Sequence, residues 1–161
     1  MNKIETFAEM VLSTTSHKVD KKFILKNHVE HALVLSKFKA SKVLDIGSGC
    51  GWTAIIYAIE NPDSVVHFLE RNEYQNEFIE NACNMLNIYN CQRWTKKQNY
   101  DLVINKMLGN WKELNFIIQN HVEGPVDVVA LDNAHTPSWV EPCGYTVLGN
   151  AGNVNVVGAA L

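Results

Sequence analysis

Three glycines alternate in a short turn that follows an apolar segment of the chain. Gly47, Gly49 and Gly51 come directly after Val43–Ile46, and the segment Trp52–Ile59 that follows has helical character. Glycine permits a positive φ and carries no Cβ that would keep a ligand away from the backbone. The helix directs its free N–H groups and the positive end of its dipole at the same turn. The turn is therefore a candidate ligand-binding loop.

Two carboxylates indicate what kind of ligand the turn takes. The pattern is Asp-x-Gly-x-Gly-x-Gly, which differs from the Gly-x-Gly-x-x-Gly of pyrophosphate sites and lacks the Gly-Lys-Ser/Thr of triphosphate sites. Asp45 supplies an anionic group that can meet a cationic amine or organise its water. Glu70 follows the apolar segment Val65–Leu69, and its carboxylate can accept hydrogen bonds from both hydroxyls of a ribose. Together they predict a nucleoside ligand that also carries an amine.

These segments resemble two motifs of the class I S-adenosylmethionine-dependent methyltransferases. Residues 43–54, Val-Leu-Asp-Ile-Gly-Ser-Gly-Cys-Gly-Trp-Thr-Ala, are similar to the first motif of that family, and residues 68–72, Phe-Leu-Glu-Arg-Asn, to the second. The resemblance implies a Rossmann-like fold and S-adenosyl-L-methionine as cofactor, with its methionine part on the turn and its ribose on Glu70. The residues expected at the cofactor are Asp45, Gly47, Ser48, Gly49, Gly51, Glu70 and Arg71.

A later segment resembles a motif that carries chemistry in small-molecule O-methyltransferases. Residues 125–135, Pro-Val-Asp-Val-Val-Ala-Leu-Asp-Asn-Ala-His, are similar to their fourth strand, where an acidic residue faces the sulfonium. The resemblance makes Asp132 that residue and His135 a general base, since histidine titrates near neutral pH. Metal-dependent members carry further Asp and Asn ligands after the next strand, which Val156–Leu161 lacks. We therefore expect catalytic roles for Asp132 and His135 and no metal site.

Strands and helices that alternate along the chain must position these groups. Apolar residues at helical spacing cover Lys21–Phe38, Trp52–Ile59, Tyr74–Leu86 and Leu108–His121. Strand-like runs are Val43–Ile46, Val65–Leu69, Val126–Leu131 and Val154–Val157, with Cys91–Trp94 and Tyr100–Ile104 as two candidates for the third strand. The alternation predicts an α/β fold: a doubly wound, Rossmann-like, mostly parallel sheet with helices on both faces. Residues 1–161 are expected to form one domain, in which residues 1–40 form a helical segment that covers the pocket.

Two assignments of the later strands remain open. In the first, Val126–Leu131 is the fourth strand and Val154–Val157 the fifth, so the sheet is shortened at its C-terminal side. The last strand would then lie at an open edge that a homo-oligomer covers. In the second, Tyr100–Ile104 is the fourth strand, Val126–Leu131 the fifth, and Tyr145–Val157 a hairpin. That assignment completes the sheet but removes the argument for Asp132.

Composition limits the partners and the compartment. The 161 residues carry a net charge of −3, which gives no extended basic surface, so we expect no nucleic-acid partner. The four cysteines form no Cys-x-x-Cys pair, and reduced thiols in a cytoplasmic protein are the simplest interpretation. No apolar run is long enough to cross a membrane, and the N-terminus lacks the apolar stretch of a signal peptide.

Two classes of function are consistent with these residues. The first is methyl transfer from S-adenosylmethionine to an oxygen or nitrogen of a small molecule. The second is a compact protein that binds or degrades S-adenosylmethionine without methyl transfer, of which lyases from viruses are examples of similar size. A lyase would form product from the cofactor alone, whereas a methyltransferase needs an acceptor. A nicotinamide cofactor is disfavoured by the glycine spacing.

Overall fold

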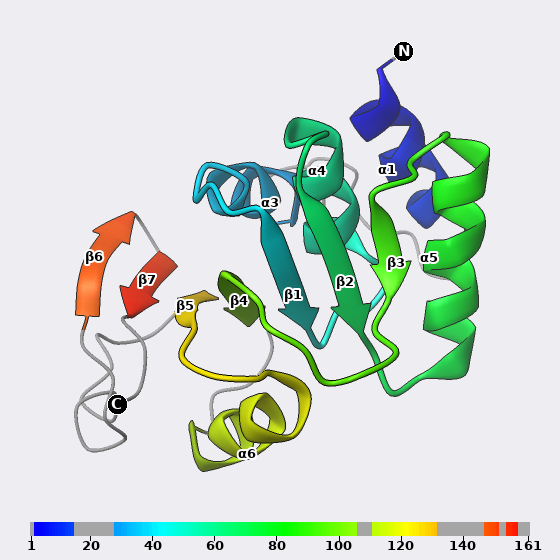
Figure 1. The fold of residues 1–161 in the computed structure, drawn as a ribbon. Helices are drawn as coiled ribbons and strands as arrows, with labels where there is room; N and C mark the ends of the chain where they lie inside the picture. The colour runs from blue at the N-terminus through cyan, green and yellow to red at the C-terminus, as the bar shows by residue number, and fades with distance from the viewer. Residues whose placement is uncertain (1, 15–27, 106–110, 132–146, 152–153, 158–161) are drawn as a thin grey trace.

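A computed structural model describes residues 2–14, 28–105, 111–131, 147–151 and 154–157. Five helices and seven strands lie in these ranges (Figure 1). The helices are α1 (Lys3–Thr14), α3 (Glu30–Leu35), α4 (Trp52–Glu60), α5 (Glu73–Met85) and α6 (Trp111–His121). The strands are β1 (Lys42–Ile46), β2 (Val65–Leu69), β3 (Cys91–Arg93), β4 (Leu102–Asn105), β5 (Asp127–Leu131), β6 (Val147–Ala151) and β7 (Val154–Val157).

The seven strands form one sheet in the order β3-β2-β1-β4-β5-β7-β6. Strands β1 to β5 are parallel, whereas β7 is antiparallel to β5 and β6 is antiparallel to β7. In the central strand, Ile46 pairs with Leu69 of β2 and with Asn105 of β4. Three neighbouring strands therefore end at the same level. Side chains and loops that follow them meet at this edge of the sheet.

The second assignment of the later strands is confirmed, and the first is wrong. Leu102–Asn105 is the fourth strand, Asp127–Leu131 the fifth, and the last two strands form an antiparallel pair. Val154–Val157 is consequently not an edge strand, because it pairs with β5 on one side and β6 on the other. In the part of the chain described, the sheet therefore continues past β5 and is not shortened as expected. The open edge at Val154–Val157, from which a homo-oligomer was inferred, is not found there either. Parallel β4 and β5 are joined through α6, the usual crossover for such strands.

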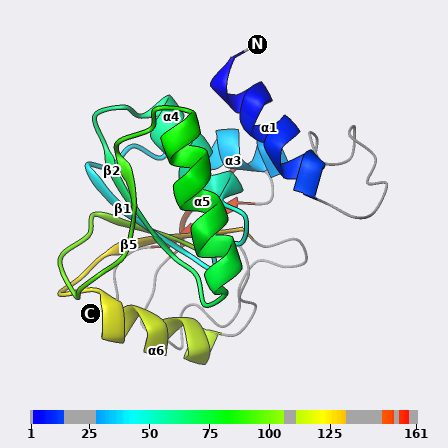
Figure 2. The ribbon, with the colours of Figure 1, turned by 90° about the vertical axis from the view of Figure 1, so that its right-hand side faces the viewer.

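Two apolar cores lie on opposite faces of the sheet, as expected for a doubly wound fold. Val43 of β1 packs with α1, α3, α4 and α5, whereas Leu44 and Ile46 pack with Leu114 and Ile118 of α6. Figures 1 and 2 show α4 and α5 on one side of the strands and α6 on the other. The alternation of neighbouring residues in β1 between the two cores follows from the two-residue period of a strand.

The described part of the N-terminal segment packs on α4. Phe7 of α1 lies edge-on to Trp52, with 5.1 Å between ring centroids, and is tilted against Phe78 of α5 at 6.3 Å. The ring of His28 stacks on the same Trp52 at 5.6 Å and an interplanar angle of 10°. These contacts anchor the segment beside the first turn of α4, where the glycine turn ends.

Among the described residues, no helix combines the length and the apolar character needed to span a bilayer.

A polar pair on the α6 side of the sheet makes stability depend on pH. Nδ1 of His67 lies 2.7 Å from the hydroxyl of Tyr100, and Nζ of Lys42 lies 5.4 Å from the centre of the Tyr100 ring. Burial, and secondly the positive charge of Lys42, lower the pKa of His67 below its ordinary 6.5. Burial raises the pKa of Tyr100 to about 12. The folded state therefore favours a neutral imidazole and a neutral phenol.

We expect the protein to lose stability as the pH falls below the ordinary histidine pKa of 6.5. Below that value the unfolded chain binds a proton at position 67 that the folded chain resists. Midpoints of thermal unfolding, followed by circular dichroism at a series of pH values, should fall less steeply on the acid side in His67→Gln. Lys42→Gln should remove part of the slope, since it removes the second cause. An unchanged acid slope in His67→Gln would contradict this account.

Candidate functional site

The glycine turn between β1 and α4 is attached to the end of β2. The N–H groups of Gly47 and Ser48 both donate to the carbonyl oxygen of Leu69, at 2.9 and 3.4 Å. All three of its glycines have a left-handed backbone, with φ of 72° at Gly47, 59° at Gly49 and 97° at Gly51. L-residues with a side chain rarely adopt such angles. Glycine at these three positions therefore allows the backbone conformation that the turn requires.

The carboxylate of Glu70 binds the turn directly. Its Oε1 accepts a hydrogen bond from the N–H of Gly49 at 2.9 Å, and its Oε2 accepts one from the N–H of Asn72 at 2.9 Å. Nδ2 of Asn76 donates to the Glu70 carbonyl oxygen, at 2.9 Å. The Asn72 side chain in turn caps α5 by accepting from the N–H groups of Tyr74 and Gln75. Each carboxylate oxygen retains a second lone pair that can accept from a ligand hydroxyl.

Two glycines of the turn have different tasks. A Cβ on Gly49 would meet no atom within 4 Å, so its open side can receive a ligand. A Cβ on Gly51 would lie 2.9 Å from Cγ1 of Ile79 and 3.2 Å from Cδ1 of Ile55. Gly51 therefore serves the close packing of the turn and α4 on α5, and Gly49 leaves space at the site.

Asp45 and Ser48 complete the turn. Asp45 is only 1% exposed at the end of β1. The Ser48 hydroxyl donates to the Asp45 carbonyl oxygen at 3.0 Å, so this side chain stabilises the turn itself.

A cavity of about 590 Å³ opens beside the turn, between the ends of β1 and β2 and helix α6. This volume lies in the usual range for sites that take small molecules and cofactors. Its lining residues are Ile46, Gly47, Leu69, Glu70, Arg71, Glu113, Phe116 and Ile117. The structure thus brings Gly47, Glu70 and Arg71 to one cavity, with Asp45, Ser48, Gly49 and Gly51 in or beside the adjoining turn.

The α6 contribution to this cavity was not foreseen. The helical pattern of Leu108–His121 directs attention to the residues that pack on the sheet, whereas Phe116 is 66% exposed and lies off that face. A large aromatic residue on the solvent side of an amphipathic helix is the signal that could have identified it. None of the described residues among 2–40 lines the cavity, so the expected cover by the N-terminal segment stays a prediction.

Asp132 and His135 lie outside the described residues. The strand that precedes them is β5, which is separated from β1 by β4. The strand end directly beside β1 therefore belongs to β4, and the residue there is Asn105, which pairs with Ile46. That Asn105, and not Asp132, stands at the strand end beside β1 could be seen only from the order of the later strands. Within the described part of the chain, no group of three or more His, Cys, Asp or Glu side chains is arranged to hold a metal ion.

Comparisons with known proteins agree with this geometry. Residues 2–136 match the family described as rRNA small subunit methyltransferase G (GidB). A ribosomal RNA small subunit methyltransferase G of Syntrophomonas wolfei subsp. wolfei is 32% identical over 102 residues, covering 58% of this chain and 48% of that protein. The protein of the same name from Psychrobacter sp. (strain PRwf-1) is 29% identical over 84 residues, covering 52% and 37%. The chain spans about half the length, or less, of these curated relatives.

A solved structure shows the same fold. The magnesium protoporphyrin IX methyltransferase of Synechocystis PCC 6803, determined with bound S-adenosylmethionine, superposes with a TM-score of 0.64. The match covers 99% of this chain and 97% of that one, at 13% identity. At this identity the likeness shows the Rossmann-like architecture and does not extend to the substrate.

The expectation of a small-molecule acceptor without a nucleic-acid partner is wrong. The matched family and both curated relatives are named for the methylation of ribosomal RNA. A net charge of −3 is a sum over the whole molecule, and that sum does not describe any local surface. The glycine turn and its acidic partner support a prediction about the cofactor only, and they carry no information on the acceptor. By its match over most of its length and by its fold, the chain belongs to the rRNA small subunit methyltransferase G family of class I S-adenosylmethionine-dependent methyltransferases.

Proposed function

We propose that this protein transfers a methyl group from S-adenosylmethionine to the ribosomal RNA of the small subunit. The observation that carries the cofactor half of the proposal is the bond between Glu70 and the Gly49 N–H, at the edge of the 590 Å³ cavity. The family match supports the acceptor half.

The residues present fit the cofactor. Glu70 lines the cavity and would accept hydrogen bonds from the ribose hydroxyls, and Arg71, Phe116 and Ile117 line the same cavity, where an adenine would pack against them. The turn from Gly47 to Gly51, with the carboxylate of Asp45, would hold the methionine part. The space that a Cβ on Gly49 would enter has no protein atom within 4 Å, as a ligand at that glycine requires.

When bound, the cofactor supplies an electrophilic methyl group on a sulfonium. The protein must then align the acceptor atom and exclude water. Asn105 pairs with Ala130, so the ends of β4 and β5 lie at one level of the sheet edge. We propose that the acceptor base enters over these two ends. Asp132 and His135 follow β5 and are proposed as acceptor-side residues, with His135 able to take a proton from the acceptor.

Methyl transfer can be tested directly with S-adenosylmethionine labelled on its methyl group. We expect label in small-subunit ribosomal RNA, presented as free RNA or as the assembled subunit, and none in large-subunit RNA. Digestion of the RNA to nucleosides then identifies the methylated base by mass. Label in neither RNA would contradict the acceptor assignment. The cofactor assignment is tested independently, by a separate measurement of cofactor binding.

A second incubation separates methyl transfer from breakdown of the cofactor. Without RNA, the protein should leave S-adenosylmethionine intact. Because a methyltransferase needs an acceptor, product formed from the cofactor alone would favour a lyase and overturn the proposal.

A further inference from the structure

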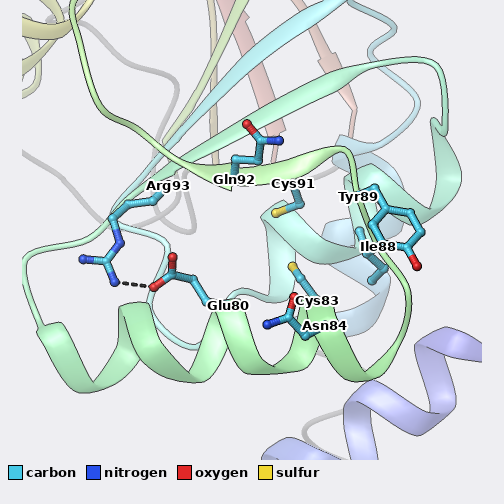
Figure 3. A pocket seen from close by; sticks show the side chains of 8 residues that line it. All are labelled: Glu80, Cys83, Asn84, Ile88, Tyr89, Cys91, Gln92 and Arg93. Carbon is cyan, nitrogen blue, oxygen red and sulfur yellow. Dashed lines mark hydrogen bonds and ion pairs between the residues drawn. The ribbon is translucent and has the colours of Figure 1, made fainter.

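A second pocket lies near the C-terminal end of α5, and no residue of the glycine turn lines it (Figure 3). Its volume is about 270 Å³, and it is bounded by the last turns of α5 and by β3. The lining residues are Glu80, Cys83, Asn84, Ile88, Tyr89, Cys91, Gln92 and Arg93. Neither the proposed cofactor site nor the acceptor edge uses any of them. Two of the eight are cysteines, and this pair is the chemically reactive part of the pocket.

The two thiols come from different elements and converge in the pocket. Cys83 lies in the last turn of α5, and Cys91 is the first residue of β3. The chain reverses between them, and the N–H of Ile88 donates to the Cys83 carbonyl oxygen at 2.9 Å. Figure 3 shows the two sulfur atoms turned toward one another across the gap between helix and strand. Each residue is only 5% exposed, but both line the pocket, which is the route by which a small reagent would reach them.

Their contact makes the two sulfur atoms unequal. A hydrogen bond from the Cys91 thiol is the main cause that lowers the pKa of Cys83, and it outweighs burial and the negative charge of Glu80. The same contact raises the pKa of Cys91 well above its usual range, and burial and the charges of Cys83 and Asp45 act in the same direction. The nearby guanidinium of Arg93 is bound to the carboxylates of Glu73 and Glu80. These directions favour Cys83 as the thiol that attacks first and Cys91 as the thiol that reacts second.

We propose that Cys83 and Cys91 form a thiol–disulfide exchange site that takes a small organic disulfide as its oxidant. The Cys83 thiolate attacks one sulfur of the reagent, forms a mixed disulfide and releases the first thiolate. Cys91 then loses its proton to water and attacks the Cys83 sulfur, which releases the second thiolate. The two protein thiols are oxidised to one disulfide, and the reagent is reduced to two small thiols. The product joins α5 to β3.

The site can be tested on the folded 161-residue chain with 2-hydroxyethyl disulfide. Cys50 and Cys143 are first replaced by serine, so that only the proposed pair can react. We expect intact-mass spectrometry to show the loss of two hydrogens, and peptide mapping to find Cys83 linked to Cys91. Dithiothreitol should restore the original mass.

Single variants on the same background assign the two roles. Cys91→Ser should stop at a stable mixed disulfide on Cys83, because the second attack cannot occur. Cys83→Ser should leave Cys91 unmodified over the same time. Far-UV circular dichroism and the unfolding midpoint confirm that each variant is folded before it is used. The proposal is overturned if the pair reacts only in denaturant, or if Cys91 is modified as fast as Cys83.

Discussion

Replacing Glu70 with alanine should weaken the binding of S-adenosylmethionine by about 100-fold or more, because hydrogen bonds to a charged group each contribute about 1.5–3 kcal/mol. The change removes the acceptor for the ribose hydroxyls. It also removes the bonds, both 2.9 Å long, that join the side chain to the N–H groups of Gly49 and Asn72. Calorimetric titration with S-adenosylmethionine and with its demethylated product measures the loss, which should affect both ligands.

Two variants show whether the loss belongs to this carboxylate. Glu70→Gln keeps one oxygen acceptor and should bind with intermediate affinity. Glu77→Ala removes an exposed carboxylate from α5, away from the cavity lining, and should bind as the original protein does. Titration with NAD provides the ligand control. Unchanged affinity in Glu70→Ala, or tight binding of NAD, would refute the assigned site.

Gly51→Ala should destabilise the fold by about 4 kcal/mol, the sum of a backbone and a packing cost of roughly 1–3 kcal/mol each. At φ of 97° an alanine is strained, and its Cβ would lie 2.9 Å from Cγ1 of the fully buried Ile79. Ile79 is part of the buried core with residues of α4 and β2, so a shift of its side chain would displace other buried side chains. Urea unfolding followed by fluorescence measures the free energy of unfolding.

Gly49→Ala is the matched variant in the same turn. Its Cβ would meet no atom within 4 Å, so only the backbone cost at φ of 59° applies, about 1 kcal/mol. That Cβ would, however, occupy the space assigned to the cofactor. We therefore expect Gly49→Ala to lose cofactor affinity while it remains folded. If Gly51→Ala proved as stable as Gly49→Ala, the packing role assigned to Gly51 would be wrong.

The glycine turn and the position of Glu70 could be predicted from the sequence, because each depends only on residues that are neighbours in the chain. The turn after β1 is specified by its glycines, and Glu70 stands directly after a strand of the expected bounds, Val65–Leu69. The placement of Glu70 beside the turn then follows from a general rule, because consecutive parallel strands end at one edge.

The later half depends on contacts between distant residues, and the sequence leaves it ambiguous. Tyr100–Ile104 and Val126–Leu131 are both apolar, and only their pairing with β1 and with each other decides which is the fourth strand. The separation of β6 from β7 by Gly152-Asn153 is a hairpin signal that supports the correct assignment. The cavity wall from α6 was missed for a related reason. Helical periodicity identifies the face toward the core, but not a residue such as Phe116 at its margin.

The two oxygens of Glu70 have a consequence for how the site meets its ligand. Since one binds the Gly49 N–H and the other the Asn72 N–H, the sugar-binding and amino-acid-binding halves form one preorganised unit. The conformational entropy of arranging these halves is lost when the chain folds, not when the ligand arrives. The binding energy of the ligand is then free to favour the reactive alignment of its methyl group over other arrangements.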